Sequence, residues 1–265
     1  MPTFTDQLQN AIFLAEKPKR IISLVPSQTE LLFDLGLENE VVGVTKFCIH
    51  PKEKVKAKTK IGGTKNFNFE VIDELQPDLI IGNKEENYQE GIEKLAEKYP
   101  VWMSDIFTLE DSLDMIRKVG ELTGKAENAT EIAAKTAEAF AALPQPEKKI
   151  PAAYFIWKNP YMAAGSNTFI DDMLQRCGFE NIFAQDERYP EISIEMLQKS
   201  RPEVILLSSE PFPFQERHFA EFQEILPDAN VMIVDGEMFS WYGSRLLKAP
   251  AYFKELLASV TSADK

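Results

Sequence analysis

The sequence predicts an α/β fold of two similar lobes, each with a parallel sheet flanked by helices, joined by one long backbone helix. One observation is a repeat, FNFEVIDELQPDLIIGN at 67–83 and ISIEMLQKSRPEVILLS at 192–208. Each copy has a helix-length segment, a proline that disfavours helical geometry in the preceding residue, and an apolar run typical of a strand buried on both faces. A second observation is the alternation of strand-like and helix-like segments, which indicates parallel sheets.

The first half begins with an apolar strand that is followed by a helix. Ser27 and Glu30 have the spacing of a capping box, which predicts that a helix starts there. Gly36 is expected to end this helix. The remaining elements predicted for this half are a strand at 41–44, a loop-rich segment at 45–66, the repeat unit with helix 67–76 and strand 78–82, a helix at 87–98 and a strand at 101–103.

The middle of the chain is predicted to be helical, and the second half returns to alternation. A helix at 110–123 ends at Gly124, and an alanine-rich helix follows at 126–143. At 1.5 Å per residue this helix could span roughly 27 Å, and its central place favours a connector. Further elements are a strand at 152–157, a helix at 168–176, the second repeat unit, a strand at 231–234 and a terminal helix at 244–259. We therefore divide the chain into a lobe at 1–125, a connecting helix at 126–144 and a lobe at 145–265.

Composition excludes several classes of partner. The formal net charge of −13 argues against nucleic acid and anionic lipid as partners. No apolar run reaches the roughly 20 residues of a membrane helix, and the N-terminal AIFLA is shorter than the roughly 7–15-residue core of a signal peptide. We expect a cytoplasmic monomer, or a periplasmic one if a leader was removed or omitted. Two cysteines in different halves favour free thiols.

The segment after the second strand carries Cys48 and His50, a pair that could hold a soft metal or a thiolate nucleophile. A closed zinc site needs three or four ligands, and the chain has only one other cysteine and one other histidine. Contact with a bound ligand, one axial bond from His50 to a chelated metal, and a simple loop role remain open. The glycine-bearing loop at 61–66 lacks the spacing of a phosphate loop. No catalytic motif is present, so we do not expect an enzyme.

Aromatic residues crowd the loops that follow the strands of the second half. They stand beside proline, glycine, asparagine and Arg245, without helical spacing, which favours a pocket lining over a core. Arg245 could offer a planar fork to an acidic or amide edge of a ligand. The aromatic residues are Trp157, Tyr161, Tyr189, Phe212, Phe214, Phe239, Trp241 and Tyr242.

Two glutamates hold the same place in the two repeats. Glu70 and Glu195 each follow a polar cap, Asn68 or Ser193, by two residues. An acid in the first turn is stabilised by the helix dipole, by roughly 0.3–1 kcal/mol. The dipole does not require the same acid at the same offset in both halves.

These residues resemble the helical-backbone class of substrate-binding proteins of ABC importers, which carry cobalamin, haem and iron–siderophore chelates. The matching segments are RIISLVPSQTELLFDLGLENEVVGV, the two glutamate repeats and AAGSNTFIDDMLQRCGFENIF, over about residues 20–258. The resemblance implies two lobes joined by one helix with the ligand between them, no cofactor beyond that ligand, and a permease that docks on Glu70 and Glu195. The implied pocket positions are Phe47, Cys48, His50, Thr64, Lys65, Asn83, Trp157, Tyr189, Glu237, Trp241 and Arg245.

Three functions follow from the resemblance and the residues. The first is a binding protein for a metal chelate that serves an ABC importer, with a corrinoid favoured over haem or an iron siderophore. Thr64 and Asn83 stand where the cobalamin binder has tryptophans, which allows a smaller or more polar chelate. The alternatives are a cytoplasmic enzyme that handles a corrinoid or tetrapyrrole on the same fold, and a ligand sensor.

Overall fold

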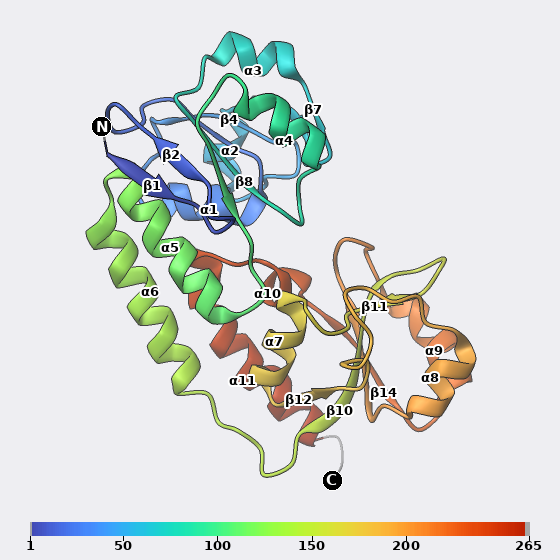
Figure 1. The fold of residues 1–265 in the computed structure, drawn as a ribbon. Helices are drawn as coiled ribbons and strands as arrows, with labels where there is room; N and C mark the ends of the chain where they lie inside the picture. The colour runs from blue at the N-terminus through green and yellow to red at the C-terminus, as the bar shows by residue number, and fades with distance from the viewer. Residues whose placement is uncertain (1, 263–265) are drawn as a thin grey trace. The chain divides into compact units, whose positions relative to one another are not determined.

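The computed structural model describes residues 2–262 of this 265-residue chain (Figure 1). The chain forms two compact units, and each is built from more than one stretch of sequence. The first unit contains Met1–Ile106, Glu110–Ala137 and Tyr242–Arg245, and the second contains Phe107–Leu109, Glu138–Trp241 and Leu246–Lys265. The division at 125 and 145 remains a prediction.

The first unit is built around a five-stranded sheet in the order β5-β4-β3-β8-β9. Every neighbouring pair of strands is parallel, as the apolar runs and helix-strand alternation predict. The strands are β3 (Ile21–Ser23), β4 (Val41–Val44), β5 (Thr59–Lys60), β8 (Leu79–Asn83) and β9 (Val101–Ser104).

Helices and two small hairpins complete the first unit, and the segment predicted to be loop-rich contains a short helix and three very short strands. The helices are α1 (Pro26–Asp34), α2 (Lys52–Lys56), α3 (Phe69–Leu75), α4 (Gln89–Ala96) and α5 (Leu109–Thr123). The hairpins pair β1 (Thr3–Thr5) with β2 (Ala11–Phe13), and β6 (Gly62–Gly63) with β7 (Asn66–Phe67).

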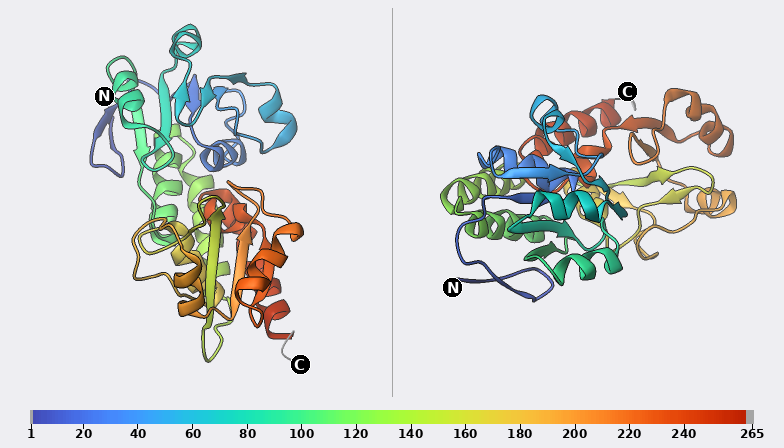
Figure 2. Two further views of the ribbon diagram at one scale, coloured as in Figure 1. Left: turned by 90° about the vertical axis from the view of Figure 1, so that its right-hand side faces the viewer. Right: turned by 90° about the horizontal axis from the view of Figure 1, so that it is seen from above.

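The second unit also has a five-stranded sheet, with β11-β10-β13-β14 in order and β12 paired to β10. All pairs are parallel except β10 with β11. Figure 2 shows these strands side by side in yellow-green to orange-red. They are β10 (Ile150–Trp157), β11 (Met162–Ala163), β12 (Phe179–Asn181), β13 (Val204–Ser208) and β14 (Asn230–Val234).

The structure confirms the helices predicted at 168–176 and in the second repeat unit, and it adds helices at 216–225 and 236–240 that the sequence analysis did not predict. The α-helices are α7 (Phe169–Cys177), α8 (Ile194–Ser200), α9 (Phe219–Ile225), α10 (Gly236–Ser240) and α11 (Ala249–Ser262), and the 3₁₀ helices are η1 (Glu216–His218) and η2 (Ser244–Leu247). The terminal helix predicted at 244–259 is thus two helices, because a 3₁₀ segment precedes α11.

The two repeat units adopt the same local structure. Asn68 accepts a hydrogen bond from the Val71 N–H at 3.2 Å, and Ser193 accepts one from the Met196 N–H at 3.1 Å. Each helix ends at a left-handed residue directly before the proline, Gln76 with φ 44° or Arg201 with φ 48°. The caps and stops predicted from the repeat are confirmed.

The capping box predicted at Ser27 is wrong. Helix α1 begins two residues earlier than that box requires, with Pro26 in the first turn and Val25 as an extended cap that has no side-chain hydrogen bond. Proline favours this position because its missing N–H would have no helical partner there. Gly36, with φ 74°, ends the helix as predicted.

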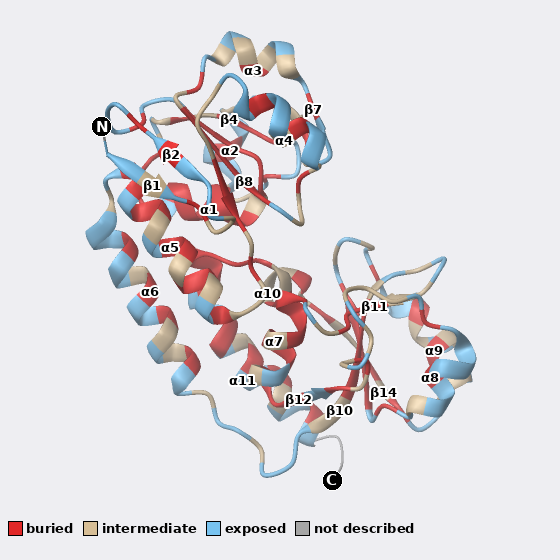
Figure 3. Ribbon diagram, viewed as in Figure 1, coloured by how far each residue is buried: buried red, intermediate tan, exposed pale blue. Residues whose placement is uncertain are grey.

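Helix α6 (Ala126–Ala141) is continuous and ends two residues before the predicted limit. Its residues up to Ala137 belong to the first unit, and the rest belong to the second. Its buried residues recur at helical spacing, and the pale-blue residues in Figure 3 mark its exposed side. The buried residues are Ala129, Ala133, Thr136 and Phe140.

Candidate functional site

In open parallel sheets, ligands bind beyond the carboxyl ends of the strands, where the strand order reverses. In the first unit this place lies beside β3, because β4 flanks β3 on one side and β8 on the other. In the second unit it lies beside β10, which pairs with β13 on one side and with β11 and β12 on the other. We call the loops at these places the first and second strand-end regions.

The loop after β4 divides its side chains between the interior and solvent. Phe47 and Ile49 are about half exposed, whereas Cys48 is buried. The Cys48 Sγ lies 3.1 Å from the Thr29 Oγ1 and 3.2 Å from the Thr45 Oγ1. Burial raises the pKa of this thiol, an effect that these hydrogen bonds only partly offset. Cys48 is therefore a packed, protonated thiol at neutral pH rather than a nucleophile.

Asn83 and Asn87 organise the loop after β8. The Asn83 side chain accepts hydrogen bonds from the N–H groups of Glu85 and Glu86 and donates to the Ser104 Oγ. Asn83 is buried, so the structure uses this amide to hold its own loop.

Asn87 joins three loops of the first strand-end region. Its Oδ1 accepts from the Asn83 N–H at 2.9 Å, and its Nδ2 lies 3.1 Å from the Thr64 carbonyl and 3.4 Å from the Leu24 carbonyl. Lys65 donates to the Glu85 carbonyl at 2.6 Å. The structure thus brings Thr64, Lys65 and Asn83 together. Sequence reasoning missed Asn87, since no cap or motif marks it.

Arg245 forms a buried ion pair inside the first unit. Its Nε lies 2.7 Å from Oε2 of Glu30, and its Nη2 lies 2.9 Å from Oε1. Both side chains are 7% exposed. The guanidinium that the sequence analysis expected to meet a ligand is instead paired with this carboxylate in two parallel hydrogen bonds.

Aromatic rings line part of the second strand-end region. Trp157, at the end of β10, is 39% exposed and packs edge-on against Phe212 with ring centroids 5.8 Å apart. The Phe212 N–H donates to the Ile156 carbonyl, which ties the loop after β13 to β10. The guanidinium of Arg188 lies 5.7 Å from the Tyr189 ring and 5.8 Å from the Phe107 ring. Sequence reasoning missed Arg188 and Phe107.

Four of the aromatic residues expected in a pocket are instead buried. Phe214, Phe239, Trp241 and Tyr242 are each at most 6% exposed. Phe239 packs against Tyr154 and Phe253, so it belongs to the core of the second unit. These four rings are thus less exposed than a pocket lining would suggest, because loop position does not determine which way a ring points, and the ligand contact predicted for Trp241 stays a prediction.

An acidic group stands beside these rings in the second strand-end region. Oε1 of Glu210 accepts hydrogen bonds from the Ser240 Oγ at 2.7 Å and from the Trp241 Nε1 at 2.8 Å. Burial raises the pKa of Glu210, and the nearby carboxylates of Glu237 and Asp235 raise it further. This group favours hydrogen-bond donors or positive charge on any molecule that contacts it.

The two glutamates of the repeats are exposed, Glu70 in the first turn of α3 and Glu195 in the first turn of α8. They belong to different units. His50 is half-buried in the loop after β4. Within residues 2–262, no three His, Cys, Asp or Glu side chains are placed to hold a metal ion together. None of the helices described is both long and apolar enough to cross a membrane.

Comparison with known proteins assigns the chain to a family. Residues 21–226 match the family described as periplasmic binding protein. The chain belongs to this family. One relative of this chain is the vitamin B12-binding protein of Pectobacterium atrosepticum. The two sequences are 27% identical over 257 residues, which cover 93% of this chain and 91% of the relative. The protein of that name from Vibrio campbellii is 29% identical over 204 residues, covering 75% of this chain and 74% of the relative.

Solved structures share the fold of this periplasmic binding protein. The haem-binding protein RhuT of Roseiflexus sp. RS-1 has a TM-score of 0.80 at 22% identity, with 93% of this chain and 99% of that one covered. The vitamin B12-binding protein BtuF of Vibrio cholerae has a TM-score of 0.78 at 23% identity, with 92% and 98% covered. The predicted fold class and family resemblance are confirmed.

Proposed function

We propose that this periplasmic binding protein captures a metal chelate, with a corrinoid favoured over haem or an iron siderophore, and delivers it to an ABC importer. The observation that carries the proposal is the exposed ring of Trp157 beside Phe212 at the second strand-end region, in a chain whose full-length relatives are named vitamin B12-binding proteins. A flat, partly apolar macrocycle can stack on such a surface.

The acidic group of the second strand-end region favours the corrinoid. Glu210 and Glu237 can accept hydrogen bonds, and a corrinoid carries amide side chains that donate them. The acidic propionates of haem would instead be repelled by the carboxylates of Glu237 and Asp235 beside Glu210. Both ligands remain in the test, because haem-binding proteins share this fold.

Residues of both units are proposed to contact the ligand. In the first unit these are the exposed Phe47 and Lys65 and the half-buried His50 and Thr64, and in the second they include Trp157, Tyr189 and Glu237. Cys48, Asn83 and Trp241 support these loops from inside. His50 is the candidate for one axial bond to the metal, because a neutral imidazole is a good ligand for iron and cobalt.

Titration with cobalamin, cobinamide and haem tests the proposal. We expect saturable quenching of tryptophan fluorescence by at least one of the three, and the tightest binding by a corrinoid. If His50→Ala alone changes the absorption spectrum of the bound metal, the axial bond is supported. Absence of binding to all three, with a purified protein that is folded and free of ligand, would contradict the proposal.

Glu70 and Glu195 are proposed as the docking points of the permease. Both lie at exposed first turns of matching helices, one in each unit. Replacing both with alanine should leave ligand affinity and stability nearly unchanged, since surface substitutions move stability by within about ±0.5 kcal/mol. Stimulation of ATP hydrolysis by the cognate transporter should fall. Unchanged stimulation would remove these residues from the docking surface.

The family supports a place outside the cytoplasm, which is the second of the two locations expected from the sequence. We propose that the protein acts there as a monomer. Fractionation of cells and sedimentation of the purified protein check these two statements separately.

A further inference from the structure

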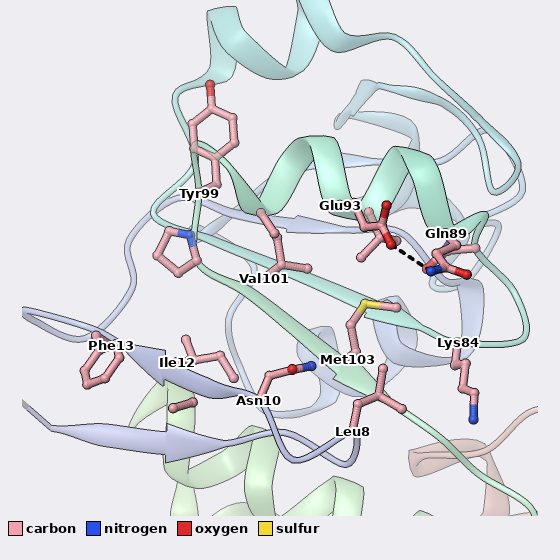
Figure 4. A pocket seen from close by; sticks show the side chains of 15 residues that line it. Leu8, Asn10, Ile12, Phe13, Lys84, Gln89, Glu93, Tyr99, Val101 and Met103 are labelled. Carbon is pink, nitrogen blue, oxygen red and sulfur yellow. Dashed lines mark hydrogen bonds between the residues drawn. The ribbon is translucent and has the colours of Figure 1, made fainter.

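A groove of about 790 Å³ lies within the first unit, between the β1–β2 hairpin, strand β9 and helix α4 (Figure 4). Binding pockets typically measure roughly 300–1,000 Å³. Figure 4 shows Ile12 and Phe13 on one side of the groove, Val101 and Met103 on the other, and Glu93 and Gln89 on α4. Asn87, which holds the loops of the first strand-end region together, also lines this groove, whereas none of the residues proposed to contact the chelate does.

The hairpin presents an unpaired strand edge to this groove. The bonds from the Asp6 N–H to the Asn10 carbonyl and from the Leu14 N–H to the Pro2 carbonyl establish which cross-strand pairs are hydrogen-bonded. Antiparallel strands alternate hydrogen-bonded and non-hydrogen-bonded pairs. The N–H and C=O groups of Ala11 and Phe13 therefore point away from β1.

Strand β9 presents a second unpaired edge. The Ile80 N–H donates to the Pro100 carbonyl, so in the parallel ladder with β8 the backbone groups of Val101 and Met103 point outward. The outward groups of Met103 already have hydrogen-bond partners, because its carbonyl accepts from the Gln7 N–H and its N–H donates to the Asp6 carboxylate. Across the described residues, the outward groups of Val101, Ala11 and Phe13 have no protein partner.

The turn of the hairpin closes one end of the groove. Asp6 is fully buried and accepts hydrogen bonds from Leu8 and Asn10 as well as from Met103, which joins the turn to the edge of β9. Past this junction the two edges have no bonds to each other, and Ile92 and Ala96 of α4 add an apolar side. The groove thus combines apolar surface with backbone donors and acceptors at two-residue spacing.

We propose that this groove binds an extended peptide segment of a partner protein, which adds as a strand between β2 and β9. An unpaired strand edge is a ready template for such addition. Backbone N–H and C=O groups on both sides match an incoming strand, whereas a lipid or dye would leave them without partners. The segment is expected to carry apolar side chains toward Ile92 and Ala96 and to contain no proline at its paired positions. The inference is independent of the proposed chelate ligand.

Selection from a phage library of random heptapeptides tests the proposal. Phage are selected for binding to the wild-type protein. Phage that also bind the Ala96→Trp variant, in which an indole fills the groove from α4, are removed, because they bind elsewhere on the surface. The matched control is Glu97→Trp on the next residue, which is exposed and does not line the groove. We expect selected peptides to bind wild type and Glu97→Trp alike, and Ala96→Trp at least about tenfold more weakly. Failure to recover any peptide that discriminates against Ala96→Trp would overturn the proposal.

Backbone pairing is tested with a matched pair of proline variants. Ala11→Pro removes an N–H that faces the groove, and Thr5→Pro removes one on the opposite edge of the same hairpin, directly across from Ala11. We expect a selected peptide to lose about fivefold or more in affinity for Ala11→Pro and little for Thr5→Pro, since a hydrogen bond contributes on the order of 1 kcal/mol. Comparison of both variants' stabilities separates this loss from hairpin damage.

Methylation of alternate amides in the peptide gives the reciprocal measurement. In a strand that lies between two edges, alternate amides face β2 and β9. Methyl groups on the amides that face β2 should abolish binding, and methyl groups on the amides that face β9 should weaken binding less, because Val101 alone offers outward, unbonded backbone groups among the described residues of that strand. Equal binding by Ala11→Pro and Thr5→Pro, or by methylated and unmethylated peptides, would overturn strand addition. So would competition by an apolar naphthalene dye with no effect of peptide methylation, or occupancy of the groove by a second copy of this chain.

Discussion

The strand-end regions of the two units are built from different chemistry. In the first, polar groups such as those of Asn83, Asn87 and Cys48 are buried and bonded to their own loops. In the second, an exposed tryptophan and a phenylalanine stand beside a carboxyl group of raised pKa. Similar helix-strand units thus carry loops of different chemistry, because the residues within each loop decide which groups are buried and which are exposed to a ligand.

Breaking the ion pair of the first unit should have the largest effect. Arg245→Ala removes the guanidinium that pairs with the buried Glu30 carboxylate, and such a loss typically costs about 3–5 kcal/mol of unfolding free energy. Denaturant unfolding measures this cost. The control in the second unit is Lys158→Ala, which breaks a more exposed pair with Glu221 and should cost at most about 1 kcal/mol. Equal costs for the two variants would contradict the distinction between a buried and an exposed pair.

Removing the aromatic surface of the second unit should weaken ligand binding. We expect Trp157→Ala to reduce affinity for the bound chelate by about tenfold, which corresponds to about 1.4 kcal/mol, through loss of stacking. Phe13→Ala serves as control, because Phe13 is an exposed ring of the first unit outside the strand-end regions. Calorimetric titration compares them. If Trp157→Ala binds as tightly as wild type, the aromatic surface is not the binding surface.

The acidic group of the second unit should make stability depend on pH. A carboxyl group whose pKa is raised by folding holds its proton more tightly in the folded state, so its contribution is complete below the unfolded pKa of 4.5 and is lost as pH rises through the folded pKa. Glu210→Gln cannot ionise. The melting temperature of this variant minus that of wild type should therefore increase as pH rises above about 4.5. A difference that stays constant between pH 4 and 8 would contradict the raised pKa.

The smallest effect is expected when the native protein is treated with a thiol reagent. Burial raises the pKa of Cys48 in the first unit and of Cys177 in the second. Neither should react with a thiol reagent at pH 7 until the protein is denatured, and then both should react. Absorbance of the released chromophore counts the reactive thiols. Stoichiometric reaction of Cys48 in the native protein would mean that the loop after β4 opens readily.

The sequence by itself determined the elements whose physics is local. The caps Asn68 and Ser193, the stops before Pro77 and Pro202, and the apolar runs of β8 and β13 all lie where the pattern predicts them. Each depends on a side chain that bonds within a few residues or on a backbone restriction, so neighbouring sequence contains the needed information. The family resemblance followed from the same segments and their order.

Only the tertiary structure decided the partners of side chains that act at long range. Arg245 meets Glu30 across 215 positions of sequence, and Asn87 bonds to Leu24 across 63. Trp241 and Phe239 are buried although they lie beside loops, while Trp157 is exposed at the end of a buried strand. Hydrogen-bond partners and burial depend on which segments pack together in three dimensions. A pattern of residue types along one chain does not contain that packing.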